Sequence, residues 1–138
     1  MAINMTILIA YDGKPDTEAA LDYATKLSVS LDEPLYVLTV VTKDQMDPEA
    51  IDTSIQTYMQ AAQERAVAAG ADVHTIIEVG KPDDTVLEVA ERFQCDAVVV
   101  GRPSRSRFDR MVMGSVSQNM VENAKCPVII VPTPEVEE

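Results

Sequence analysis

The order of the apolar segments is the feature that most constrains the fold of this chain. Short runs rich in Val, Ile and Leu alternate along its 138 residues with longer segments whose apolar residues recur at helical spacing. The short runs are residues 5–11, 35–41, 73–79, 97–100 and 128–131. The helical segments are residues 16–31, 48–69, 83–94 and 115–124. Nearly continuous apolar strands separated by helices predict a parallel sheet that is covered by helices on both faces.

Right-handed crossovers leave few topologies for such a chain, and a doubly wound three-layer α/β/α sandwich is the simplest of them. The length predicts one domain, residues 1–138, with an acidic tail at 133–138. In such folds a ligand binds beyond the carboxyl ends of the strands, where the winding reverses. The candidate site loops are therefore Asp12-Gly13, residues 40–43, Gly80-Lys81 and residues 101–120.

The local patterns also predict how the helices begin, end and pack. Asp16 is a plausible N-cap of the first helix, and Gly70 closes the second. The predicted buried stripes are Ala20, Tyr23, Ala24, Leu27 and Leu31 in the first helix, Ile51, Ile55, Met59, Ala62 and Ala66 in the second, and Val86, Val89, Ala90 and Phe93 in the third.

Charge and hydropathy limit the function classes. The chain has 11 basic and 23 acidic residues and a formal net charge of −12, which argues against general binding to nucleic acids or anionic membranes. No apolar run approaches the ~20 residues that a membrane span requires. The first apolar run, residues 5–11, is too short for a signal peptide and lacks a basic flank. We therefore expect a soluble cytoplasmic protein.

Residues 101–120 stand out against this acidic background. Four of the six arginines, Arg102, Arg105, Arg107 and Arg110, lie between Gly101 and Gly114. Gly101 ends a strand, where a missing Cβ lets the backbone approach a ligand. Gly114-Ser115 opens a helix whose first N–H groups favour an anion, and guanidinium groups add attraction for phosphate. The alternative is structural: Ser115 and Gln118 fit a capping box, and loop arginines are often only solvated.

The cysteines and the histidine give weaker signals. Cys95 and Cys126 lie 31 residues apart and match no metal-ligand spacing. Each precedes a predicted strand, so the two could lie close together at one end of the sheet. We expect two reduced and mostly buried thiols, with a disulfide or redox pair as the alternative. His74, near the start of the third strand, is expected at the surface.

Three stretches resemble the universal stress protein family: "ILIAYDG", "VGKPDDTVLEVAERFQCDAVVVG" and "GSVSQNMVENAKCPVIIVP". The nucleotide-binding branch of that family has a Gly-x2-Gly-x9-Gly-[Ser/Thr] pattern. Gly101 and Gly114-Ser115 match its ends, whereas Ser104 replaces the middle glycine, and Pro103 favours an extended Arg102. The resemblance spans residues 5–132 and implies a five-stranded parallel sheet in the order 3-2-1-4-5.

The resemblance also implies a ligand, an adenine nucleotide such as ATP with Mg or Mn, and a regulatory role in the stress response. Asp12 corresponds to the acidic residue near the adenosine, and Val40 to the residue whose backbone meets the adenine. The positions that hold ribose and phosphates correspond to Gly101, Gly114, Ser115 and Val116. The Ser104 hydroxyl and the nearby Arg102 and Arg105 could offset the missing glycine. Family members also commonly dimerise through the last strand, here residues 127–132.

Two other function classes remain open at this point. The chain could be a stress-response interaction protein that binds no nucleotide and acts through its homodimer surface. It could also be an enzyme, but it lacks a G-x-x-x-x-G-K-[ST] loop and a D-x-D pattern, and no group is evidently placed to activate water. We therefore predict no catalytic residues, no metal site without a nucleotide, and at most slow ATP hydrolysis; Asp12 and Ser115 are the candidate contacts of a Mg or Mn ion that accompanies the nucleotide.

Overall fold

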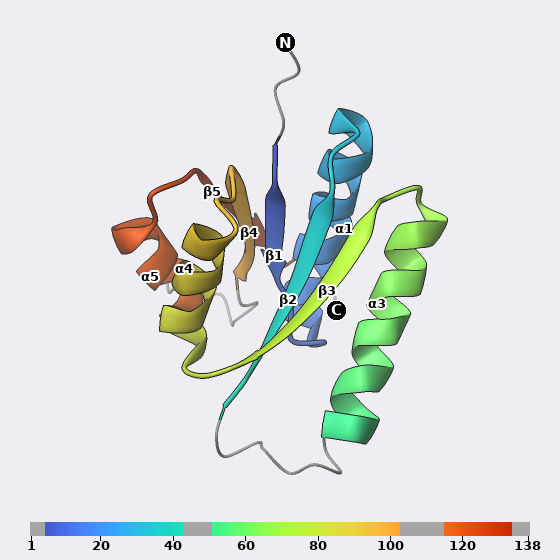
Figure 1. The fold of residues 1–138 in the computed structure, drawn as a ribbon, viewed down its shortest axis with the longest axis horizontal. Helices are drawn as coiled ribbons and strands as arrows, with labels where there is room; N and C mark the ends of the chain where they lie inside the picture. Colours follow the sequence, from blue (N-terminus) through green and yellow to red (C-terminus); the bar gives the residue numbers. More distant parts are fainter. Residues whose placement is uncertain (1–4, 43–50, 103–114, 134–138) are drawn as a thin grey trace, which may run out of the picture.

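The fold is a parallel sheet between two layers of helices (Figure 1). The computed structural model describes residues 5–42, 51–102 and 115–133. Five strands lie in the order β3-β2-β1-β4-β5. Their bounds are Ile7–Ala10 (β1), Leu35–Val41 (β2), Val73–Val79 (β3), Ala97–Arg102 (β4) and Val128–Pro132 (β5). The helices are Pro15–Leu31 (α1), the π-helical turn Ile51–Ile55 (η2), Gln56–Ala68 (α3), Pro82–Arg92 (α4) and Ser115–Asn123 (α5). The predicted architecture and strand order are confirmed.

The two faces of the sheet contribute to two separate cores. Side chains of β1 alternate between them, because successive residues of a strand point to opposite faces. Ile7 and Ile9 belong to the core beneath α1 and α3, whereas Leu8 belongs to the core beneath α4 and α5. In Figure 1, α4 and α5 lie on the left of the sheet and α3 on the right. The central strands are buried on both sides, which explains their continuous apolar sequence.

The register brings the carboxyl ends of the central strands to one edge of the sheet. Ile9 of β1 is level with Val37 of β2 and with Val99 of β4. All three strands are parallel, so the loops that follow them emerge on the same side. This edge is where a ligand site is expected in a doubly wound sheet.

Helix α1 differs from its prediction at its start. Asp16 is not the N-cap: Lys14 occupies that position in an extended conformation, and Pro15 is the first helical residue. Proline suits this position because its φ is already helical and the missing N–H would have no intrahelical partner. The sequence-based assignment of Asp16 is therefore wrong.

The predicted buried stripe of α1 is also partly wrong. Tyr23 and Leu31 are 45% and 42% exposed. The side that faces the sheet instead carries Leu21 together with small or hydroxylated residues: Ala20, Ala24, Thr25 and Ser28. Thr25 donates a hydrogen bond to the Leu21 carbonyl at 2.7 Å, and Ser28 donates to the Glu33 carbonyl. Internal hydrogen bonds of this kind remove the cost of burying a hydroxyl.

The second helical segment is broken into η2 and α3, and residues 48–50 of its predicted range lie outside the described residues. Its predicted stripe is confirmed where it is described. Ile55, Met59, Ala62 and Ala66 are buried, whereas the Ile51 side chain lies outside the described part. Gly70, with φ of +100°, follows the end of α3 as predicted.

The remaining helices and strands match their predictions to within two residues at each end, including β1, which begins two residues later and ends one residue earlier than predicted. Of the predicted α4 stripe, Val86, Val89 and Ala90 are buried, but Phe93 is 39% exposed, with its ring 5.4 Å from that of Tyr36. Residues 134–138 of the acidic tail lie outside the described residues. None of the helices that the structure describes combines the length and the apolar character needed to cross a bilayer.

Candidate functional site

A cavity of about 580 Å³ opens at the carboxyl edge of the sheet, at the ends of β1, β2 and β4. Its volume is within the roughly 300–1,000 Å³ typical of small-ligand sites. The lining residues come from strand ends, from the helix starts that follow them, and from η2 and α3. They are Ala10, Tyr11, Asp12, Lys14, Thr17, Leu38, Val40, Thr42, Ser54, Ile55, Tyr58, Pro82, Val86, Val100, Gly101 and Val116.

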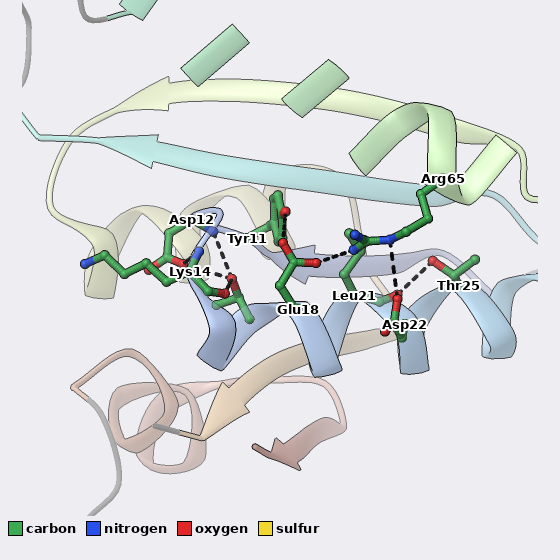
Figure 2. Close-up of polar contacts among 9 residues, drawn as sticks. Tyr11, Asp12, Lys14, Glu18, Leu21, Asp22, Thr25 and Arg65 are labelled. Carbon is green, nitrogen blue, oxygen red and sulfur yellow. Dashed lines mark hydrogen bonds and ion pairs between the residues drawn. The ribbon is translucent and has the colours of Figure 1, made fainter. Parts of the chain in front are cut away.

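Asp12 organises the polar side of this cavity. Its Oδ1 accepts hydrogen bonds from the Lys14 backbone N–H at 2.9 Å and from the Thr17 hydroxyl at 2.8 Å (Figure 2). The Asp12 backbone N–H donates in turn to Thr17 Oγ1 at 3.3 Å. Among the described residues, the second carboxylate oxygen, Oδ2, has no hydrogen-bond donor. One oxygen of Asp12 therefore shapes the turn into α1, and the other can accept a bond from a ligand.

Two tyrosines form the wall beside this turn. The ring of Tyr58, from α3, lies 5.7 Å from the ring of Tyr11 in an edge-on arrangement, with 74° between the planes. Gly13 has φ of +79°, and a Cβ at this position would lie 2.8 Å from the Tyr58 ring. Glycine is needed here for both reasons, because other residues disfavour this φ and a side chain would displace the tyrosine. Burial raises the pKa of Tyr58.

A chain of polar contacts supports Tyr11 from behind the cavity (Figure 2). The Tyr11 hydroxyl donates to Glu18 at 2.5 Å, and Glu18 also pairs with Arg65 of α3. Arg65 reaches Asp22 at 3.5 Å, one turn further along α1. Burial, followed by the hydrogen bond to the Glu18 carboxylate, raises the pKa of Tyr11 well above its usual value. These contacts tie the end of β1 to both α1 and α3.

The opposite side of the cavity is apolar. Its side chains come from β2, α4, β4 and α5, belong to or pack against the core beneath α4 and α5, and are Leu38, Val40, Val86, Val100 and Val116. Ile55 of η2 is also apolar but belongs to the core that contains Tyr11. Leu38, Val86 and Val100 are at most 1% exposed, so their positions are set by the core. An apolar surface facing a carboxylate and several hydroxyl groups suits a ligand with an aromatic ring at one end and polar groups at the other.

Helix starts also converge on this cavity. Lys14 is the N-cap of α1, Pro82 is the first residue of α4, and Val116 is the second residue of α5. The first N–H groups of a helix have no intrahelical acceptor, and the helix dipole adds a partial positive charge at this end. The cavity is therefore more favourable to a negatively charged ligand than the net charge of the chain suggests.

Gly101 lines the cavity, and its own packing also requires a glycine. A Cβ at this position would collide with the backbone carbonyl of Asp16 and lie 3.3 Å from the Thr17 Cα. The start of α1 therefore rests directly on the end of β4. The glycine permits close approach, as the sequence predicted, but the group that approaches it in the described residues is the chain's own helix.

The structure brings four of the predicted site residues together: Asp12, Val40, Gly101 and Val116 all line the cavity. Arg102 is the last residue of β4 and is not among the lining residues; its carbonyl accepts a hydrogen bond from the Thr133 hydroxyl at 2.8 Å.

The other predicted positions fall outside what the structure describes. Ser104, Arg105 and Gly114 lie in residues 103–114, which are not described. Ser115 is the first residue of α5, but its side chain is also outside the described part. The contribution of this stretch to the site remains a prediction.

Several lining residues escaped prediction. Lys14 lies in the turn after β1, and Thr17 lies in the first turn of α1. The Asp12-Gly13 pair predicted a site loop in this region but identified neither residue. Ser54 and Tyr58 come from η2 and α3, far along the chain from any strand end. A helical pattern shows which residues are apolar, but it does not show where the helix lies over the sheet, and no signal in the sequence identified these two.

Comparisons with known proteins concern the whole chain rather than single residues of the site. A family model described as "Universal stress protein family" matches residues 4–132. A universal stress protein of Methanocaldococcus jannaschii is 25% identical over an alignment of 142 positions. The alignment covers 95% of this chain and 84% of the relative.

Two solved structures are similar over nearly the whole chain. A universal stress protein in complex with cAMP has a TM-score of 0.79 at 28% identity, covering 96% of this chain and 100% of the other. A universal stress protein from Archaeoglobus fulgidus in complex with dAMP has a TM-score of 0.75 at 25% identity, covering 94% and 99%.

Proposed function

The chain belongs to the universal stress protein family, and from this premise we propose that its 580 Å³ cavity binds an adenine nucleotide. We propose that the bound nucleotide has a regulatory role in the stress response. We also propose that the protein acts in the cytoplasm. ATP is the first candidate, because the predicted phosphate-binding stretch, residues 101–120, holds four arginines.

The observation that supports this proposal most directly is the position of the cavity. It lies at the carboxyl ends of the neighbouring strands β1 and β4. The helices that follow these two strands, α1 and α5, cover opposite faces of the sheet. Four residues that the family resemblance assigned to a nucleotide, Asp12, Val40, Gly101 and Val116, line it. Two similar proteins were crystallised with adenine nucleotides, cAMP and dAMP.

The lining residues fit the two chemical halves of an adenosine. The apolar surface around Val40 would cover the base, with the backbone of Val40 meeting its polar edge, and Val116 would lie beside the ribose and phosphates. Asp12 Oδ2 would accept a hydrogen bond from the sugar or the base. Charge-assisted bonds of this kind are the stronger ones in proteins.

The proposed phosphate end lies beside the starts of α1 and α5. Here Gly101, Gly114 and Ser115 would offer main-chain groups and a hydroxyl, with Ser104, Arg102 and Arg105 as further candidates. With ATP, we propose that Mg or Mn accompanies the phosphates and neutralises part of their charge. Among the described residues, no cluster of three or more His, Cys, Asp or Glu side chains is arranged to hold a metal by itself.

We also propose that the protein forms a homodimer through β5. In the described sheet β5 is an edge strand that pairs only with β4. Its four apolar residues, Val128–Val131, are only partly buried, although their sequence is as apolar as that of the central strands. An exposed apolar edge is an aggregation hazard unless something covers it, and a second copy of the strand would do so.

Calorimetry on nucleotide-free protein tests the nucleotide proposal. ATP with magnesium, AMP and cAMP are each titrated into the chain, with GTP as the comparison for the base. We expect saturable heat with at least one adenine nucleotide and weaker binding of GTP. Heat equal to dilution for all the adenine nucleotides at millimolar concentration would exclude the proposal. Sedimentation of the same sample tests the dimer independently.

A further inference from the structure

We propose that Cys95 and Cys126 form a pair that hydrogen peroxide oxidises slowly to an intrachain disulfide between the starts of β4 and β5. This site lies at the opposite end of α4 and α5 from the 580 Å³ cavity, and the proposal does not depend on nucleotide binding. Both thiols are free in the structure.

The first observation is a shared cavity. Both cysteines line a second hollow of about 370 Å³, on the α4 and α5 side of the sheet. The apolar side chains around them are Leu87, Ala90, Met120 and Ala124. Cys95 is 7% exposed, whereas Cys126 is partly exposed. An oxidant can therefore reach Cys126 first, and the cavity gives the two side chains room to approach each other.

The strand register places the two residues near each other. Cys95 lies two residues before β4, and Cys126 lies two residues before β5. Val98 is level with Val128, and the Val98 N–H donates to the Pro127 carbonyl at 3.0 Å. Continuing this register puts Cys126 level with Asp96, one residue from Cys95.

Neighbouring strands are about 4.8 Å apart, so the residues just before β4 and β5 can approach to the separation that a disulfide needs. Both cysteines precede their strands, so the packing of their side chains, and not strand alternation, decides which face they occupy. Disulfides usually join Cα atoms about 4.4–6.8 Å apart. Both cysteines also pack against the same core cluster, so their side chains lie on the same face of the sheet.

The chemistry requires two steps and one oxidant, a hydroperoxide. In the first step the Cys126 sulfur attacks a peroxide oxygen, the O–O bond breaks, and Cys126 becomes a sulfenic acid as water leaves. In the second step the Cys95 sulfur attacks the Cys126 sulfur and displaces its hydroxyl as a second water. The two thiols lose two electrons and two protons in total, and the peroxide is reduced to two waters.

The surroundings keep the pair reduced at rest. Burial, and then the negative charge that Cys126 and Asp96 can carry, raises the pKa of Cys95 to about 11. Burial and then Asp96 raise the pKa of Cys126 as well. Asp96 is held by a 2.7 Å bond from the Thr6 N–H. At the rim of the cavity, Lys125 is neutralised by Glu91 at 2.9 Å. The thiolate is the reactive form, so both thiols react slowly at neutral pH and low peroxide.

The test treats the full-length, fully reduced chain with hydrogen peroxide and identifies the products that the two thiols form. We expect the chain to stay monomeric on a denaturing gel without reductant, to lose both alkylatable thiols, and to lose the mass of two hydrogen atoms. Tryptic digestion should yield one peptide joining residues 93–105 to residues 126–138. Because the bond closes a loop of about 30 residues, we expect the unfolding equilibrium constant to fall on the order of 100-fold.

Cys95→Ser and Cys126→Ser serve as matched controls. Cys95→Ser should accumulate a trappable sulfenic acid at Cys126, whereas Cys126→Ser should react more slowly than the parent. The parent chain is also equilibrated with a glutathione buffer, in the native state and in urea. This measurement uses neither variant, so it does not depend on how well the variants fold. A native pair should form the disulfide at least about tenfold more favourably than the unfolded chain. Equal constants in the two states, or disulfides formed only between chains, would overturn the proposal.

Discussion

The two cavities lie at opposite ends of the same pair of helices, and their chemistry differs accordingly. The starts of α4 and α5 line the larger cavity through Pro82 and Val116. The far ends of the same helices line the smaller one through Glu91 and Asn123. The larger cavity therefore meets helix N–H groups, whereas the smaller one meets helix carbonyl groups.

Helix direction, rather than composition, therefore sets the different electrostatic environments of the two ends. Helix N-termini favour anions, and helix C-termini disfavour them. The proposed nucleotide phosphates would therefore be favoured at one end, whereas the thiols at the other end remain in their neutral form. Every helix between parallel strands runs back across the sheet, so this polarity is common to all the crossovers. The predictions below test whether the two ends are independent.

The largest expected effect comes from filling the nucleotide cavity. Val116→Trp puts an indole where we expect the ribose and phosphates, and should weaken adenine-nucleotide binding by at least about 100-fold, or about 2.7 kcal/mol. The disulfide reaction of Cys95 with Cys126 should be unaffected. Calorimetry and peroxide titration measure the two outcomes.

The matched control for this variant is Val121→Trp on the same helix. Val121 is 57% exposed and lines neither cavity. Its nucleotide affinity should equal that of the parent chain. If both tryptophan variants lose binding to the same extent, the effect arises from α5 as a whole and the cavity assignment fails.

A somewhat smaller effect is expected where β4 supports α1. Gly101→Ala places a methyl group against the Asp16 carbonyl, and should lower the free energy of unfolding by about 1–3 kcal/mol. Gly70→Ala is the comparison, since nothing lies within 4 Å of a Cβ there and only its φ of +100° opposes the change. Urea denaturation measures both. If Gly101→Ala left the free energy of unfolding unchanged, α1 would be able to move away from β4 at no cost.

The charge of Asp12 is expected to contribute about tenfold to nucleotide affinity, or about 1.4 kcal/mol. Asp12→Asn keeps an oxygen that can accept bonds from the Lys14 N–H and the Thr17 hydroxyl, but it removes the charge. Stability should therefore stay close to that of the parent, and calorimetry should show the loss.

Asp32→Asn is the control for net charge, because Asp32 ends α1 in a left-handed conformation that asparagine also adopts. An equal change in affinity for the two variants would mean that overall charge, rather than a contact at Asp12, explains the result.

The smallest effect concerns alkaline pH. The pKa values of Tyr11, Tyr58, Cys95 and Cys126 are all raised in the folded state. The native chain therefore binds more protons than the unfolded chain above about pH 8.5, where free thiols begin to ionise, and its stability should fall as the pH rises toward 11.

A difference of one bound proton between the folded and unfolded states changes the free energy of unfolding by ~1.4 kcal/mol per pH unit. Tyr11→Phe removes one of the groups that cause this difference, so it should reduce the slope by part of that amount. Urea midpoints between pH 8 and pH 10.5 measure the slope, with Tyr23→Phe, an exposed ring, as the control. A Tyr11→Phe slope that matches that of the parent would show that the Tyr11–Glu18 contact does not hold the proton.

Much of the fold could be predicted because its signals are local. The strands β2 and β3 begin and end at the predicted residues, since both are rich in Val and Ile or Leu and β3 is bounded by Asp72 and Gly80. Asp12-Gly13 correctly located a strand end, and Gly70 correctly located a helix end. The errors concern packing: Tyr23 and Leu31 are apolar enough for a core, yet the face of α1 that approaches the sheet carries mostly smaller residues.

By itself, the sequence determined the alternation of strands and helices, the strand ends that carry Asp12 and Gly101, and the family. Each of these depends on residues close together in the chain, where hydrophobic periodicity and turn chemistry act directly. It took the packing of the layers to place Tyr58 beside Tyr11, the start of α1 on Gly101, and Cys95 and Cys126 in one cavity. These contacts join residues far apart in the chain, and their distances depend on how the layers pack, which no local pattern records.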